Sequence, residues 1–185
     1  TIGSHTGYKG HAESMNVLKR LPFPATLVII GDRGDCLKSC KHQAQAINSA
    51  HNNKRVILLD LDRAQTVDAL KSADVFLFLS NIEASPLVLY EAAAAGLPFV
   101  ASAAGNSAEI AKWTGGGLIV KTNFRQDNGF AQVSTFSVTS LITRIRLNRK
   151  LRRKLGEDGH LNWSKKFTWD NITEQYLDLY ERSLT

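Results

Sequence analysis

Short, continuous runs of apolar residues recur along this chain, and each is followed by a stretch with the spacing of an amphipathic helix. Runs without polar interruption are typical of strands that are covered on both faces, as in a parallel sheet. The expected strands are residues 26–30 and the runs within "KRVILLDLD", "ADVFLFLS", "PFVAS" and "GGGLIV". The pattern therefore predicts parallel strands with helices packed on them.

Helical stretches separate these strands, at about residues 10–20, 35–50, 63–72, 86–95 and 107–113. Strands that alternate with helices are joined by right-handed crossovers and build a doubly wound α/β fold. The chain opens on Thr1-Ile2-Gly3, which is interpreted as a first strand already partly cut. We expect a Rossmann-like, doubly wound parallel sheet of about six strands.

The rest of the chain is expected to add two C-terminal helices. Residues 121–134 are polar and without apolar periodicity, which predicts a loop. Helices are predicted at 137–155 and 169–184, the last with an apolar stripe of Trp169, Ile172, Tyr176, Leu179 and Tyr180. Such a stripe must pack on something, either this domain or another one. No repeat or linker divides residues 1–185, which are interpreted as one domain.

Composition limits the class of protein. The 185 residues are 43% hydrophobic and 22% charged, as in an ordinary soluble domain that can bury a core. No apolar run approaches the roughly 20 residues that a membrane span needs, and no segment resembles a signal peptide. A cytoplasmic protein is expected.

Seven of the 23 cationic residues lie between Arg144 and Lys154, and the 16 others nearly balance the 17 acidic residues. The net charge of +6 therefore comes from this one stretch. Apolar residues interleave with them at helical spacing, which predicts one helix with a core face and a solvated basic face. Peripheral contact with anionic lipid headgroups is the second interpretation. Nucleic acid is not expected as a partner, since no aromatic residues accompany the cations to stack on bases.

Cys36 and Cys40 are four residues apart on an expected helix, and His42 is nearby. A structural zinc site needs four ligands in paired spacings, and these three residues do not supply them. The pattern therefore favours reduced, partly packed thiols, and no metal site is predicted.

One carboxylate, Glu91, lies in an otherwise apolar helix within "NIEASPLVLYEAAAAGLP", and the apolar residues on opposite sides of this helix predict that it is covered all round. Ser85 and Pro86 are a strong helix-start signal, which leaves the amides of Leu87 and Val88 pointing out of the helix end at the carboxyl edge of the sheet. An anion such as a phosphate suits that position. Because Glu91 is about 9 Å further along the helix axis, a ligand with its phosphate at the amides would present a ribose diol to it.

Other interpretations stay open for both acids of this segment. Glu83, in the turn before the helix, would sit at the other end of such a ligand, or it is a surface acid that benefits from the nearby helix N-terminus. Glu91 either holds a ligand or pairs with a lysine or arginine elsewhere in the fold. Spacing alone does not choose between these roles.

The ordered set "GSHTGYKGH", "VIIGDRG", "LKSADVFLFLS", "EASPLVLYEAAAAGLPFVAS", "GNSAEI", "GGGLIV" and "KKFTWDNITEQYLDLY" resembles the retaining glycosyltransferases of the two-domain GT-B type, group 1 (family 4). Glu83 and Glu91 match that family's Glu-x7-Glu signature in spacing. The resemblance covers most of the chain and implies the C-terminal, donor-binding half of a GT-B fold. It also implies that an N-terminal acceptor domain is absent from this chain.

The resemblance implies a role for each matching residue. Glu91 is expected to bind the ribose of a nucleotide sugar, and Glu83 to be the catalytic residue beside the donor sugar. Lys9 matches the lysine that neutralises the departing diphosphate, so no metal ion and no cofactor are expected. The donor-binding residues implied are Lys9, Ser85, Leu87, Val88 and Glu91.

The implied reaction is hexosyl transfer from a UDP- or GDP-sugar to an acceptor with retention of configuration, in the synthesis of cell-envelope polysaccharide or glycolipid. The fragment by itself is expected to be inactive. The family commonly has an arginine where this chain has Ser4, and loss of a bidentate phosphate contact follows. Either another cation replaces it, with Arg33 as a candidate, or the donor differs, or the activity is weak.

Two other classes of function are alternatives for this chain. A dinucleotide-dependent oxidoreductase needs Gly-x-Gly-x-x-Gly after the first strand, and Gly3, Gly7 and Gly10 have the wrong spacing. A non-catalytic nucleotide- or sugar-binding module that keeps the fold is the alternative that Ser4 leaves open.

Overall fold

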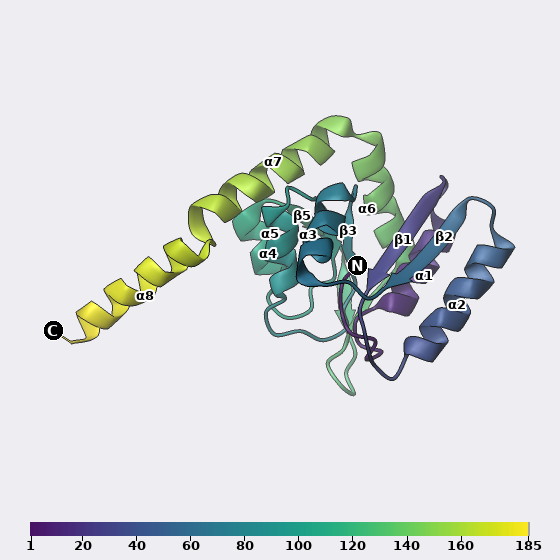
Figure 1. Cartoon of the computed structure of the whole chain (residues 1–185), viewed down its shortest axis with the longest axis horizontal. Helices are drawn as coiled ribbons and strands as arrows, with labels where there is room; N and C mark the ends of the chain where they lie inside the picture. The colour runs from purple at the N-terminus through teal and green to yellow at the C-terminus, as the bar shows by residue number, and fades with distance from the viewer. Residues whose placement is uncertain (185) are drawn as a thin grey trace.

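The structure is a computed structural model that describes residues 1–184 (Figure 1). Its strands are β1 (Ala25–Ile30), β2 (Lys54–Leu59), β3 (Phe76–Phe78), β4 (Phe99–Ala101), β5 (Gly117–Ile119), β6 (Thr122–Phe124) and β7 (Ala131–Val133). Its helices are α1 (His11–Arg20), α2 (Leu37–Ala50), α3 (Arg63–Ser72), α4 (Leu87–Ala94), α5 (Ser107–Thr114), α6 (Thr135–Leu147), α7 (Arg149–Lys166) and α8 (Trp169–Ser183).

Five strands are parallel, as predicted, and form two hydrogen-bonded groups. β1 pairs with β2, and β3, β4 and β5 pair in that order. Ile2, in the segment interpreted as a partly cut first strand, makes a parallel bridge to Ile30 of β1. The α/β fold of parallel strands and crossover helices is thereby confirmed.

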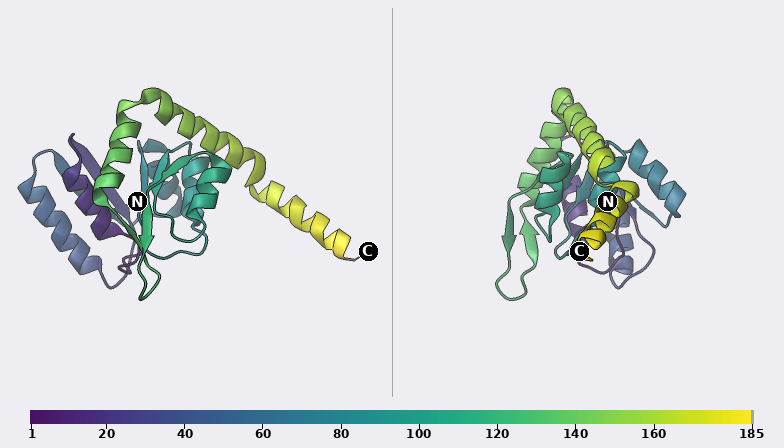
Figure 2. Two further views of the ribbon diagram at one scale, coloured as in Figure 1. Left: turned by 180° about the vertical axis from the view of Figure 1, so that it is seen from behind. Right: turned by 90° about the vertical axis from the view of Figure 1, so that its left-hand side faces the viewer.

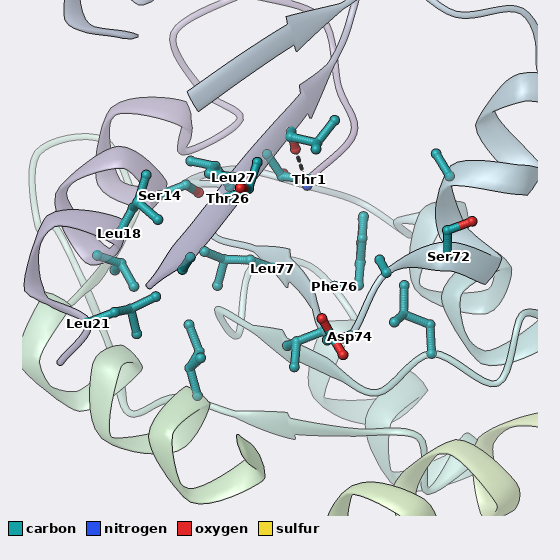
Figure 3. Close-up of a pocket in the computed structure, with 18 of the residues that line it drawn as sticks. Thr1, Ser14, Leu18, Leu21, Thr26, Leu27, Ser72, Asp74, Phe76 and Leu77 are labelled. Carbon is teal, nitrogen blue, oxygen red and sulfur yellow. Dashed lines mark hydrogen bonds between the residues drawn. The ribbon is translucent and has the colours of Figure 1, made fainter. Parts of the chain in front are cut away.

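An apolar cavity of about 490 Å³ separates the two groups of strands next to Thr1 (Figure 3). Leu27 of β1 and Phe76 and Leu77 of β3 are among the residues that line it. The lining includes none of the residues predicted to bind a donor. This cavity is therefore a gap in the sheet and not the candidate site.

Both faces of the β3–β4–β5 group are covered, which explains the continuous apolar runs. Phe76, Phe78 and Phe99 face a cluster that includes residues of α4 and α5. Leu77 and Val100, their neighbours in sequence, face a cluster that includes residues of α1, α6 and α7. A third cluster packs α1 and α2 on β1 and β2.

The segment expected to be a loop, residues 121–134, contains a short antiparallel hairpin of β6 and β7. Each strand has only three residues, which is too short to show an alternating pattern. The main chain and the side-chain amide of Asn81, after β3, hydrogen-bond to Ala131 of β7. The hairpin therefore borders the carboxyl edge of the central strands.

The stretch expected to be a single helix over 137–155 is two helices, α6 and α7, and this prediction was wrong. The chain turns at Asn148, whose side chain accepts a hydrogen bond from the amide of Leu151 and so caps α7. Asparagine is a favoured capping residue because its side chain replaces the missing helical acceptor. The cationic residues 144–154 thus lie on two helices.

The last helix, α8, extends away from the rest of the molecule (Figures 1 and 2). None of its residues is buried. The side chains of Trp169, Tyr176, Leu179 and Tyr180, predicted as an apolar stripe, are all exposed. Of the two partners considered for this stripe, the body of this domain is not the one it packs on.

Candidate functional site

Lys9 and Glu83 meet at the carboxyl edge of the sheet, 74 residues apart in sequence. The Lys9 Nζ donates to the Glu83 Oε1 at 2.6 Å, and the Glu83 side chain is only 11% exposed. Lys9 lies in the loop before α1, and Glu83 lies in the turn between β3 and α4. The sequence predicted that both residues border one crevice, and the structure brings them into contact.

The loop that carries Lys9 is held against the end of β3. The carbonyl of Tyr8 accepts hydrogen bonds from the Asn81 amide at 2.7 Å and from the Ser80 hydroxyl at 3.0 Å. Gly10 has a φ of +68°, and a Cβ there would lie 2.1 Å from the carbonyl oxygen of Leu79. Only glycine permits this close approach, which explains why glycine directly follows Lys9.

The start of α4 lies beside Glu83. Ser85 was expected to cap this helix, but its exposed side chain makes no capping hydrogen bond, and Pro86 occupies the N-cap position. Pro86 has an extended backbone (φ −75°, ψ 100°) and is displaced by one residue from the expected first helical position. Within the described chain, the amides of Leu87 and Val88 have no acceptor, as is usual at a helix N-terminus.

Glu91 has a partner in the structure. Its Oε1 accepts a hydrogen bond from the Nη1 of Arg63, the first residue of α3, at 2.6 Å. The Glu91 side chain is 26% exposed and that of Arg63 is 69% exposed, so solvent reaches the pair from the arginine side. An ion pair was one of the two alternatives that the sequence allowed for Glu91, and it is present. The pair leaves the Glu91 carboxylate accessible to solvent.

The helix was expected to be covered all round, which was wrong. Leu87, in its first turn, is 68% exposed. The other side is covered, since Tyr90 contacts Phe167 with ring centroids 4.9 Å apart. Burial, and to a smaller extent the nearby Glu109, raises the pKa of Tyr90, so this phenol is neutral and takes no part as an anion.

Arg33 does not replace the missing arginine at position 4 in this structure. Its side chain is 92% exposed and pairs with the adjacent Asp32 at 3.1 Å. Ser4 is partly buried in the loop that leads to Lys9. Glu83 therefore has Lys9 as its cationic partner, and Arg33 is paired with Asp32 instead.

The two cysteines come together with two histidines that sequence reasoning missed. His5, His11, Cys36 and Cys40 offer ligand atoms that all lie within 4.8 Å of one another. His42, the neighbour considered from sequence, is exposed and is not part of this group. The sequence feature that could have indicated this group is a pair of histidines flanking "TGYKG", but they are more than 20 residues from the cysteines.

None of the described helices is long and apolar enough to cross a membrane.

Comparison with known proteins places these features in a family. The family model described as "Glycosyl transferases group 1" matches residues 1–160. A search of curated proteins found no match.

Two similar solved structures are more than twice as long as this chain. WaaG, a glycosyltransferase involved in lipopolysaccharide biosynthesis, is 21% identical with a TM-score of 0.72, covering 94% of this chain and 44% of its own. Anabaena HepE, solved in complex with UDP and glucose, is 16% identical with a TM-score of 0.78, covering 98% and 47%. The chain thus spans less than half the length of either.

A shorter structure matches over most of its own length. The C-terminal domain of LpcC, a group 1 family protein from Francisella tularensis, is 22% identical with a TM-score of 0.72. The match covers 91% of this chain and 85% of that domain. At these identities the structural likeness shows a shared fold.

Proposed function

Because this chain belongs to the group 1 glycosyltransferases, we propose that it is the donor-binding half of an enzyme that transfers a sugar from a UDP- or GDP-sugar to an acceptor. The proposed transfer is of a hexose and retains the anomeric configuration. The acceptor-binding half would be a separate N-terminal domain.

The contact between Lys9 and Glu83 beside the start of α4 is the observation that carries this proposal. An ammonium group has three donors, so Lys9 can keep Glu83 and also donate to a diphosphate oxygen. The Leu87 and Val88 amides and the helix dipole add positive potential at the same place. Stabilisation of the departing diphosphate by these groups would take the place of a metal ion.

In this arrangement Glu83 lies at the donor sugar and Glu91 at the ribose. Glu91 is four residues after the first residue of α4, on a helix that rises about 1.5 Å per residue. A carboxylate accepts hydrogen bonds from both hydroxyls of a diol, and such charge-assisted bonds are strong. When a ribose binds, Arg63 would either keep its ion pair with Glu91 beside the ribose hydroxyls or release it.

We place the reaction in the cytoplasm, in cell-envelope polysaccharide or glycolipid synthesis. The support for this setting is the structural similarity to WaaG, which is itself a glycosyltransferase involved in lipopolysaccharide biosynthesis. Residues 144–154 would contact anionic headgroups, although Arg153 and Lys154 already pair with Glu157 and Asp158.

Calorimetric titration of the chain with UDP, GDP and their hexose conjugates tests donor binding. Glu91→Gln is expected to lower nucleoside diphosphate affinity about tenfold to a hundredfold, as lost charge-assisted hydrogen bonds of roughly 1.5 to 3 kcal/mol imply. Arg63→Gln is the matched control, because it breaks the same ion pair and keeps the carboxylate. Its affinity is expected to stay within about threefold of wild type.

Equal affinity of wild type and Glu91→Gln for every nucleotide would contradict the assignment and leave Glu91 as a structural partner of Arg63. No binding of any nucleotide to the wild-type chain would contradict the proposed donor site as a whole.

The second candidate, a binding module without catalysis, is favoured by Ser4 and by the exposure of Arg33. The chain joined to an acceptor domain separates the two. Turnover lost in Glu83→Gln, with nucleotide affinity retained, indicates the enzyme. Binding without turnover in any pairing indicates the module.

A further inference from the structure

A group of two histidines and two cysteines, all buried except the partly exposed Cys36, joins the Lys9 loop to the start of α2. His5 lies before Lys9, His11 is the first residue of α1, Cys36 is the N-cap residue of α2 and Cys40 lies in its first turn. The four ligand atoms lie within 4.8 Å of one another, and the two sulfur atoms are 3.5 Å apart.

The imidazole nitrogens of this group are buried without hydrogen bonds. His5 is fully buried, and His11 and Cys40 are each 3% exposed. Both ring nitrogens of His5 and of His11 lack a partner among the described residues. Buried polar groups are almost always satisfied, so four such nitrogens in one place indicate a ligand.

We propose that His5, His11, Cys36 and Cys40 bind one Zn²⁺ ion in a tetrahedral structural site. Two cysteines and two histidines are a set that zinc prefers, and Zn–S bonds of about 2.3 Å in a tetrahedron place the sulfur atoms about 3.8 Å apart. Binding forms two Zn–S and two Zn–N bonds and releases the two thiol protons to solvent. The two thiolates cancel the charge of the ion, which suits a buried position.

The backbone already holds the two segments together. The His5 amide donates to the Arg33 carbonyl at 2.6 Å, and the Cys36 amide donates to the His5 carbonyl at 2.9 Å. Gly34 has a φ of +138°, and a Cβ there would lie 2.1 Å from the His5 carbonyl oxygen. The ion would add a link to a scaffold that is already in position.

One consequence rests on the proposed function. His5 and His11 flank Lys9, so the ion would fix both ends of the loop that presents Lys9 to a diphosphate. Removal of zinc would then weaken nucleotide binding although no ligand touches the metal.

The test is the metal content of the full chain, purified without a histidine tag or chelator and under reducing conditions. Mass spectrometry of the metal is expected to give about one zinc per chain. Cobalt in place of zinc is expected to give the intense visible bands and the sulfur-to-metal charge transfer of tetrahedral thiolate sites. Cys40→Ser is expected to lose both signals. His42→Gln, an exposed histidine on the same helix, is expected to keep them.

The wild-type protein keeps the proposal testable if Cys40→Ser does not fold. Zinc added to chelator-treated wild type should raise its melting temperature, and Mg²⁺ should not. Less than about a tenth of an equivalent of zinc after incubation and dialysis, without cobalt bands, overturns the proposal. A mass two hydrogen atoms below that of the reduced chain, in protein isolated under the same reducing conditions, indicates a Cys36–Cys40 disulfide in place of two metal-binding thiols and also overturns it.

Nucleotide titration with and without zinc separates this proposal from the proposed function. Zinc binding without nucleotide binding contradicts only the donor site, and nucleotide binding without zinc contradicts only the metal site. Equal nucleotide affinity with and without bound zinc overturns the role of the ion in positioning Lys9.

Discussion

At the scale of single residues, the two glutamates of the Glu-x7-Glu pair are both in ion pairs, but in different surroundings. Glu83 is 11% exposed and bonds Lys9, whereas Glu91 is more accessible and bonds a mostly exposed arginine. Water screens the second pair and stabilises its separated charges. The first pair is therefore the stronger structural link, and also the one placed at the proposed diphosphate.

A double-mutant cycle in urea unfolding tests this difference. Lys9→Gln, Glu83→Gln and the double variant are expected to give a coupling free energy of about 1 to 2 kcal/mol, because removing one partner leaves the other charge poorly solvated. The cycle of Arg63→Gln and Glu91→Gln is the control and is expected to give less than about 1 kcal/mol. Couplings of equal size would show that burial does not distinguish the pairs.

At the scale of elements, α7 approaches the sheet through glycines. A Cβ at Gly156 would lie 2.5 Å from the carbonyl oxygen of Gly96, and one at Gly159 would lie 3.0 Å from the Cα of Gly116. These contacts are with backbone, which cannot swing aside as a side chain can. The two glycines therefore allow α7 to lie across the turns that follow α4 and α5.

Gly156→Ala is expected to lower the free energy of unfolding by about 1 to 3 kcal/mol, because overpacking outweighs the better helix propensity of alanine. Lys150→Ala, at an exposed position of α7, is the control and is expected to change it by less than about 0.5 kcal/mol. Chemical denaturation measures both. A Gly156→Ala variant as stable as the wild type would mean that α7 moves outward without cost.

At the scale of the whole molecule, α8 stands apart from the body (Figure 2). Its aromatic residues are exposed to solvent. Phe167, just before it, stacks against Trp113 and makes a tilted ring contact with Tyr90. The boundary between the packed molecule and the projecting helix is therefore at residues 167–168.

A chain that ends at Phe167 is expected to keep its melting temperature within about 2 °C, since 1 kcal/mol corresponds to about 2 to 4 °C for a domain of this size and α8 buries no residue. Differential scanning calorimetry measures the change. A chain that ends at Ser164, which also removes Phe167, is the control and is expected to melt lower. A large drop on removal of α8 alone would show that it packs on the body in solution.

The sequence by itself determined the order and type of the elements of the sheet. Continuous apolar runs indicate strands buried on both faces, and α3 spans the residues that its pattern predicted. Its start is fixed locally, because Asp62 and Gln65 form a capping box. Signals of this kind lie within a few residues of one another. Local chemistry was misleading only where a short element or a competing cap was involved, as at β6, β7, Ser85 and Asn148.

Only the tertiary structure decided which distant side chains meet. Glu91 could be recognised as a charge in need of a partner, but Arg63 lies on another helix, and no pattern in the chain identifies it. The same holds for His5 and His11 with Cys36 and Cys40, which separate crossovers bring to one edge. Pairing between elements depends on how helices lie on the sheet, and packing of many side chains sets that arrangement, whereas sequence spacing describes one element at a time.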